Sequence, residues 1–117
     1  MLTSTVKVTE RRMSPRTAVL DITGEVNAAA EAPLMAAYTQ ASEAGVKTIL
    51  LNFTGLTYMN STGIGLLVTL LIRISRQKQR LMAYGLNDHY RQIFKLTRLD
   101  EAIGLYSSEE EALRAAG

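Results

Sequence analysis

The sequence predicts one α/β domain over residues 1–117, with about four helices packed on a mixed β-sheet of about five strands. The chain has the length of a single domain, and its 47% hydrophobic content can supply a core without disulfides or metals. Short runs rich in β-branched residues alternate with apolar residues at helical spacing. No repeat, low-complexity tract or linker interrupts the order β-β-α-β-α-β-α-β-α, which favours one sheet covered by helices.

The first two strands are expected at residues 5–9 and 17–23, which are rich in threonine and valine. Ser14 and Pro15 lie between them and are typical of a turn. Gly24 is expected to end the second strand. The chain is therefore expected to open with a β-hairpin.

A helix is expected next, because Asn27 can cap its start and Pro33 suits its first turn. Gly45 is expected to end this helix. Its apolar residues recur at helical spacing: Leu34, Met35, Tyr38 and Ala41.

A strand buried on both faces is expected at residues 47–53, a mostly apolar run bounded by glycines. Residues 54–60 are expected to form a loop. The helix after this loop should lie deep against the sheet, because it carries a wide apolar stripe. The stripe consists of Ile64, Leu67, Val68, Leu71 and Ile74, widened by Leu66 and Leu70.

The last third of the chain predicts a strand at residues 81–86, a helix at 88–96 and a strand at 103–106. A terminal helix follows, capped by Ser107 or Ser108, with glutamates in its first turn where the helix dipole favours anions. The buried side of the 88–96 helix is expected to consist of Ile93, Phe94 and Leu96.

Composition excludes several classes of function. The absence of cysteine removes disulfides, thiolate metal sites and cysteine nucleophiles, and it suits the cytoplasm. A net charge of +2 does not indicate a nucleic-acid-binding protein. The cations at residues 73–80 are explained by the end of a helix, where positive charge complements the helix dipole. Residues 1–10 lack a secretory signal pattern. The most apolar segment, residues 64–74, is shorter than the roughly 20 residues of a membrane span.

Enzyme motifs are absent as well. A nucleophile elbow around Ser61 would need a glycine where Met59 stands. His89 is the only histidine, and a surface or capping role is expected for it. Gly63 and Gly65 match part of a dinucleotide fingerprint, but its other elements are missing. We therefore expect no catalytic residue, no cofactor and no metal site.

Two adjacent hydroxyls, Ser61 and Thr62, precede the most apolar helix. Ordinary N-capping by Asn60 or Ser61 would explain one of these polar side chains. If Asn60 caps, Ser61 and Thr62 occupy the exposed first turn, and Gly63 and Gly65 leave room for another protein to approach. A phosphate on this turn would lie at a helix N-terminus, where amides and the dipole tolerate it.

These residues resemble the STAS family of bacterial anti-sigma factor antagonists, whose motif reads Asp-Ser-Ser/Thr-Gly before an apolar helix. The resemblance runs from about residue 5 to residue 112 and implies a single STAS domain over residues 1–117. Asn27 and Asn60 stand where the family usually has aspartate, which makes the site less acidic. The matching segments are Asn60-Ser61-Thr62-Gly63-Ile64-Gly65-Leu66-Leu67 and Gly24-Glu25-Val26-Asn27.

The resemblance implies an anti-anti-sigma factor in transcription regulation and stress response. Its partner would be an anti-sigma factor that is also a serine kinase and phosphorylates Ser61, with Thr62 as a weaker alternative. The unphosphorylated form would bind this kinase and release a sigma factor, and a PP2C-type phosphatase would restore binding. The expected binding surface comprises Gly24, Glu25, Asn27, Asn60, Thr62, Gly63, Ile64 and Leu66.

Other functions stay open at this point. A STAS module can act unphosphorylated as a scaffold or accessory subunit, in a stressosome-like assembly or an ABC lipid-transport complex. A module that senses a small ligand or a nucleotide near Ser61 is another alternative. A weak homodimer is also left open.

Overall fold

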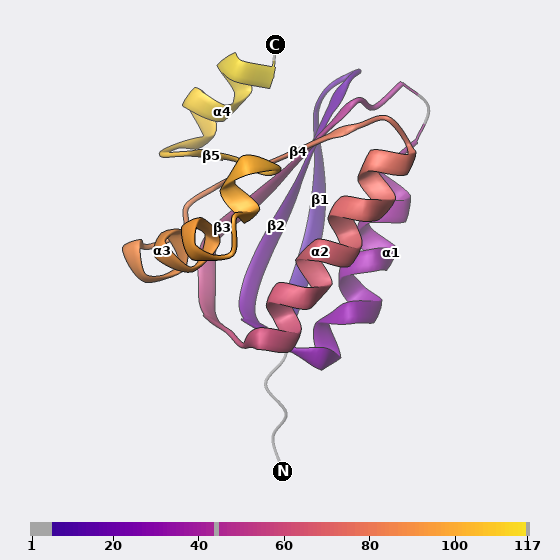
Figure 1. Cartoon of the computed structure of the whole chain (residues 1–117). Helices are drawn as coiled ribbons and strands as arrows, with labels where there is room; N and C mark the ends of the chain where they lie inside the picture. Colours follow the sequence, from indigo (N-terminus) through magenta and orange to yellow (C-terminus); the bar gives the residue numbers. More distant parts are fainter. Residues whose placement is uncertain (1–5, 44, 117) are drawn as a thin grey trace.

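The computed structural model describes residues 6–43 and 45–116, in which five strands form one mixed sheet of order β1-β2-β3-β4-β5 (Figure 1). β1 runs antiparallel to β2, and the other neighbouring strands are parallel. The predicted mixed sheet with an opening hairpin is confirmed. The strands are β1 Val6–Ser14, β2 Thr17–Val26, β3 Thr48–Met59, β4 Arg80–Tyr84 and β5 Gly104–Tyr106.

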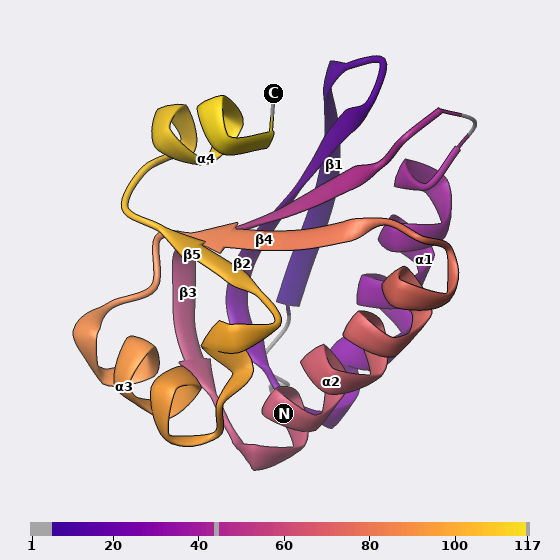
Figure 2. The same ribbon diagram turned by 45° about the horizontal axis from the view of Figure 1, so that its top comes forward.

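Four helices within the described residues cover this sheet unequally. α1 (Glu31–Ala41) and α2 (Ser61–Arg76) lie side by side, and α3 (Asp88–Leu96) packs into the same core. α4 (Glu109–Ala116) stands apart from them in Figure 2 and closes a second, smaller core on the other face. Two short 3-10 turns are η1 (Ala28–Ala30) and η2 (Leu99–Glu101). No helix in the described ranges is long and apolar enough to cross a membrane.

β3 is the central buried strand that the sequence predicts. Leu50 and Leu51 are both fully buried, although their side chains point to opposite faces of the sheet. Leu51 belongs to the core under α1 and α2, whereas Leu50 packs with Ala112 of α4. Burial on both faces explains why this strand is a continuous apolar run.

Polar side chains cap the starts of η1 and α4. The Oδ1 atom of Asn27 accepts a hydrogen bond from the Ala29 amide at 2.9 Å and starts η1, which leads directly into α1. At α4, the Ser108 hydroxyl accepts from the Glu111 amide, and the Glu111 carboxylate accepts from the Ser107 amide. The capping role predicted for the serine pair is confirmed. Asn27 caps the 3-10 turn η1 and not α1 itself, which begins after Ala30 without a side-chain cap.

The predicted loop at residues 54–60 is wrong, because β3 continues through Met59 beside β2. Gly55 signals a turn in the sequence, but here it permits a close approach of the two strands. A Cβ atom at residue 55 would lie 2.9 Å from the Thr23 hydroxyl. β1 likewise runs on to Ser14, and residue 5 of its predicted range lies outside the described residues.

Two apolar side chains predicted to be buried are exposed. Val68 of α2 is 39% exposed and Leu96 of α3 is 73% exposed, because each lies outside the arc that the buried residues of its helix form. The end of α1 also differs, since the helix stops at Ala41 and the left-handed Gly45 (φ 93°) belongs to the following loop. β2 does not end at Gly24 as predicted but continues to Val26, because it stays paired with β3. β4 and β5 differ from their predicted bounds by one or two residues.

Candidate functional site

The candidate site lies where β2 and β3 end and α2 begins, at one end of the sheet (Figure 1). Val26 pairs with Met59 in the last step of the β2–β3 ladder. The amide of Asn60 then donates to the Val26 carbonyl at 3.3 Å. The two segments that the sequence singles out, residues 24–27 and 60–66, are therefore in direct contact.

Asn60 is the N-cap of α2. Its backbone is extended (φ −93°, ψ −178°), and its Oδ1 atom accepts a hydrogen bond from the Gly63 amide at 2.9 Å. Its carbonyl accepts from the Ile64 amide at 3.0 Å. One side chain thus completes the cap, and the hydroxyl of Ser61 is not needed for it.

Ser61 and Thr62 are the first two residues of α2, and both are exposed. Neither hydroxyl makes a hydrogen bond to another residue in the described ranges. The first amides of a helix have no partner within the helix and point outward from its start. A phosphate attached to this turn would find amide donors and the positive end of the helix dipole beside it.

Gly63 does not leave room for another protein, contrary to the expectation from the sequence. It is buried, and a Cβ atom there would lie 2.1 Å from the Val26 carbonyl oxygen. Leu66 is also buried, at 7% exposure, and Ile64 is half-buried. Gly65 is the glycine that faces open space, because a Cβ atom at residue 65 would have nothing within 4 Å.

The β2 side of the predicted surface consists of Gly24, Glu25 and Asn27. Gly24 has a φ of 99°, a left-handed conformation that favours glycine, and the β2–β3 register shifts directly after it. Glu25 is half-buried opposite Tyr58. Asn27 uses its side chain to cap η1, so it resembles Asn60 in both residue type and role.

A strip of exposed small and apolar residues continues the site along α2. Ser61, Gly65, Val68 and Ile72 recur at spacings of four, three and four residues and are all exposed, so they lie on one side of the helix. We call them the exposed α2 stripe. Ile72 is 47% exposed, and Tyr58 just before the site is 51% exposed. The sequence signal for the exposed α2 stripe is the width of the apolar arc of this helix, since one buried face does not need so many apolar residues.

Tyr90 of α3 holds the end of β3 just before the site, a contact that the sequence does not predict. Its hydroxyl accepts a hydrogen bond from the buried Met59 amide at 2.8 Å, just before the Asn60 cap. Asn87 caps α3 by accepting a hydrogen bond from the Tyr90 amide. His89, for which we expected a surface role, is exposed with its ring 4.8 Å from that of Tyr90.

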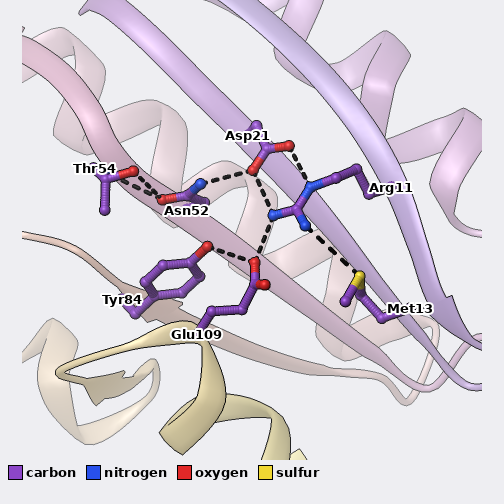
Figure 3. Close-up of polar contacts among 7 residues, drawn as sticks. All are labelled: Arg11, Met13, Asp21, Asn52, Thr54, Tyr84 and Glu109. Carbon is purple, nitrogen blue, oxygen red and sulfur yellow. Dashed lines mark hydrogen bonds and ion pairs between the residues drawn. The ribbon is translucent and has the colours of Figure 1, made fainter.

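A second polar cluster lies on the sheet face that α4 covers (Figure 3). The Arg11 guanidinium donates to both carboxylate oxygens of Asp21, at 2.6 and 2.8 Å, and to Glu109 of α4 at 2.6 Å. Glu109 also accepts from the Tyr84 hydroxyl at 2.7 Å, and Asn52 donates to Asp21 at 2.7 Å. We call these five residues the Arg11 network. It joins β1, β2, β3, β4 and α4.

Charge pairing controls the protonation of this network. Hydrogen bonds from Arg11 hold the pKa values of Asp21 and Glu109 below their usual range, despite partial desolvation. Burial, followed by the bond to Glu109, raises the pKa of Tyr84 to about 12. Both acids are satisfied by neighbours, so the network suits attachment of α4 and not acid–base chemistry. The described residues contain no group of three or more potential metal-binding side chains.

Comparisons with known proteins agree on one family. A family model described as the STAS domain matches residues 9–112. The anti-sigma-B factor antagonist of Staphylococcus aureus (strain NCTC 8325 / PS 47) is 26% identical over 87 residues, which cover 74% of this chain and 81% of that protein.

Two solved structures share the fold. An anti-sigma factor antagonist from Mycobacterium paratuberculosis has a TM-score of 0.80 and 16% identity, covering 95% of this chain and 93% of that one. The Bacillus cell fate determinant SpoIIAA in the phosphorylated form has a TM-score of 0.68 and 24% identity, covering 94% and 99%. At these identities the structural likeness shows the fold alone.

Proposed function

The chain belongs to the STAS domain family of anti-sigma factor antagonists, and on this premise we propose that it is an anti-anti-sigma factor switched by phosphorylation at Ser61. The family consists of regulators and not of enzymes. The proposed partner is an anti-sigma factor with serine kinase activity, and the proposed reverse step is hydrolysis by a PP2C-type phosphatase. The whole function would reside in this one domain, acting in the cytoplasm.

The proposal rests on the different roles of Asn60 and Ser61 at the start of α2. Asn60 caps α2, whereas the Ser61 hydroxyl is exposed and makes no hydrogen bond within the described ranges. A kinase needs a serine that it can reach and modify without breaking the fold. Ser61 meets that need better than Thr62, because the family motif places its phosphorylated serine at position 61.

The proposed switch acts on a protein surface. In the unphosphorylated state the partner would cover the start of α2, the residue 24–27 segment and part of the exposed α2 stripe. A phosphate on Ser61 adds a charge of about −1.5 to −2 to that surface. A partner surface complementary to a neutral serine would then have to desolvate this charge, so binding is lost.

The two asparagines shape this interface in the proposal. Asn27 and Asn60 keep the hydrogen-bonding roles of short polar side chains, as both caps show. They carry no charge, so the unphosphorylated site attracts basic groups of a partner less than two aspartates would. We therefore propose that the cognate kinase presents a less basic surface here than is usual for partners of this family.

Phosphorylation of the full chain tests the proposal directly. The chain is incubated with a candidate kinase encoded beside it and ATP, followed by intact-mass analysis and site mapping. We expect one phosphate, on Ser61, and none on the Ser61→Ala variant. The Thr62→Ala variant is the matched control, because it removes the adjacent exposed hydroxyl and should still be phosphorylated.

The same variants separate a switch from a fixed scaffold. Ser61→Ala should keep binding the kinase in the presence of ATP, whereas the unmodified chain should be released. A phosphate mapped elsewhere, with Ser61 untouched, would contradict the site. Stable binding to a partner without any phosphorylation would favour the scaffold alternative.

A further inference from the structure

A hollow of about 380 Å³ lies at the end of the sheet opposite Ser61, where the parallel strands begin. We call it the amino-end hollow. It lies between the sheet and the end of α4, where Ala116 forms part of its wall. The rest of its lining is polar and consists of three cations and three hydroxyls: Arg16, Lys47 and Arg80, and Ser14, Thr17 and Thr48.

The sheet holds four of these polar residues in one row. Ser14 pairs with Thr17, Thr17 with Thr48, and Thr48 with Arg80, so four strands present their side chains at one level. The backbone fixes the remaining cations. Amides of Lys47 and Thr48 donate to the Arg16 carbonyl at 2.8 and 3.0 Å, and the Arg80 amide donates to the Lys47 carbonyl at 2.8 Å.

The two threonines are unusual for buried polar residues. Thr17 is 6% exposed and Thr48 is 4% exposed, yet neither hydroxyl forms a hydrogen bond to another residue of the described ranges. Polar groups in buried residues normally have a partner, because an unsatisfied one costs free energy. No fully enclosed side-chain polar atom in the described part of the chain lacks a partner, so these hydroxyls must keep an opening. Both residues line the hollow, and their hydroxyls are therefore available to a molecule bound there.

The residues that line the hollow carry positive charge that no acidic residue among them balances. Three cations line it and no acidic side chain does. The ion pairs among the described residues involve Arg11, Arg98 and Arg114 instead. All three cations are exposed, so solvent screens their mutual repulsion, and they remain free to pair with an anion that enters the hollow.

We propose that the amino-end hollow binds a small anion that carries a phosphate or pyrophosphate group. Guanidinium groups match the geometry of phosphate oxygens, the Lys47 ammonium adds a mobile charge, and hydroxyls supply further donors. The volume is that of a small-molecule site. This site is separate from the Ser61 surface and does not depend on its function.

Titration of the ¹⁵N-labelled full chain with sodium pyrophosphate at constant ionic strength tests the proposal. We expect saturable shifts of the amides around Arg16, Lys47 and Arg80. The Arg16→Gln/Lys47→Gln double variant should weaken binding by about tenfold or more, because charge-assisted hydrogen bonds contribute on that order. The matched control is Arg91→Gln/Lys95→Gln, which removes the same charge from exposed positions of α3 and should bind normally.

Two further measurements distinguish a built site from a general attraction of anions. Thr17→Val and Thr48→Val keep the charge and nearly the volume, and each should weaken pyrophosphate binding while circular dichroism stays unchanged. Citrate, a polyanion without phosphate, should bind more weakly than pyrophosphate. Shifts that do not saturate, equal binding of citrate, or unchanged affinity of the Arg16→Gln/Lys47→Gln variant would overturn the proposal.

Discussion

Gly63 lies directly against the Val26 carbonyl oxygen, which would be 2.1 Å from a Cβ atom at residue 63. We predict that Gly63→Ala destabilises the domain by a few kcal/mol, about 1–3, as overpacking of a tight contact does. The obstacle is backbone of β2 and not a flexible side chain, so relaxation would have to move the strand end away from α2. Thermal or urea unfolding measures the loss.

Gly65→Ala is the control for this prediction. Gly65 lies in the same helix, two residues on, with nothing within 4 Å of a Cβ atom. Alanine there should leave stability unchanged or raise it by up to about 1 kcal/mol, because alanine favours helix more than glycine does. Equal effects of the two substitutions would show that helix propensity, and not the Val26 contact, decides the result.

These two glycines show the limit of prediction from sequence. Both stand in the helix pattern of α2, and the spacing alone treats them alike. Their difference arises from the end of β2, far earlier in the chain, which packs on one of them only. Such a contact depends on the strand register, and local patterns do not contain it.

The fold class, by contrast, was predictable, because it depends mainly on local patterns. Apolar periodicity and capping residues act locally, so the helix bounds of 88–96 and the capping role of Ser108 followed from nearby residues. The continuation of β3 to Met59 was not predictable, since it depends on pairing with β2. The bond from Met59 to Tyr90 likewise joins residues that only the fold brings together.

The Arg11 network should make stability depend on pH. The pKa values of Asp21 and Glu109 are lowered by folding, so the folded state binds their protons more weakly than the unfolded state. Their stabilising contribution is therefore present above their ordinary pKa values of 3.8 and 4.5 and is lost as pH falls through the lowered values. Urea unfolding at several pH values should show this decline.

Glu109→Gln tests the same network at neutral pH. We expect a loss of about 1 kcal/mol, the size of a partly exposed ion pair with good geometry, and a difference from the unmodified chain that narrows in acid. Glu110→Gln is the control, because Glu110 makes an exposed, longer contact of 3.6 Å to Arg114 and its loss should cost little. Equal losses would mean that helix-start charge, and not Arg11, is responsible.

At alkaline pH the same network predicts a second decline. The pKa of Tyr84 rises from 10.0 to about 12 on folding. The contribution of Tyr84 is therefore complete below pH 10 and is lost as pH rises through about 12. Tyr84→Phe should remove this dependence, which unfolding curves between these pH values can check.

The exposed α2 stripe should form part of the partner interface. We predict that Gly65→Arg weakens binding of the cognate anti-sigma factor by about tenfold or more, because a long charged side chain would enter the contact surface. The domain should stay folded, since residue 65 faces open space. Ala115→Arg on the exposed side of α4 is the matched control. Calorimetric titration that finds equal affinities for both variants would exclude the stripe from the interface.

The last prediction is that Ser61→Asp abolishes partner binding without destabilising the domain. Residue 61 is the first residue of α2, where the dipole favours an anion by about 0.3–1 kcal/mol. The Asn60 cap stays in place, because its hydrogen bond goes to Gly63 and not to Ser61. The melting temperature should therefore be unchanged or slightly higher.

Binding should fail because the charge would be desolvated in the complex. An unpaired buried charge costs several kcal/mol, and about 1.4 kcal/mol already corresponds to a tenfold change in affinity. Ser61→Asn is the matched control, since it has the same size as aspartate without the charge. Thermal melts and titrations of both variants decide the matter. A large drop in melting temperature, undiminished affinity of Ser61→Asp, or an equal loss in Ser61→Asn would contradict a switch that acts through charge at the interface.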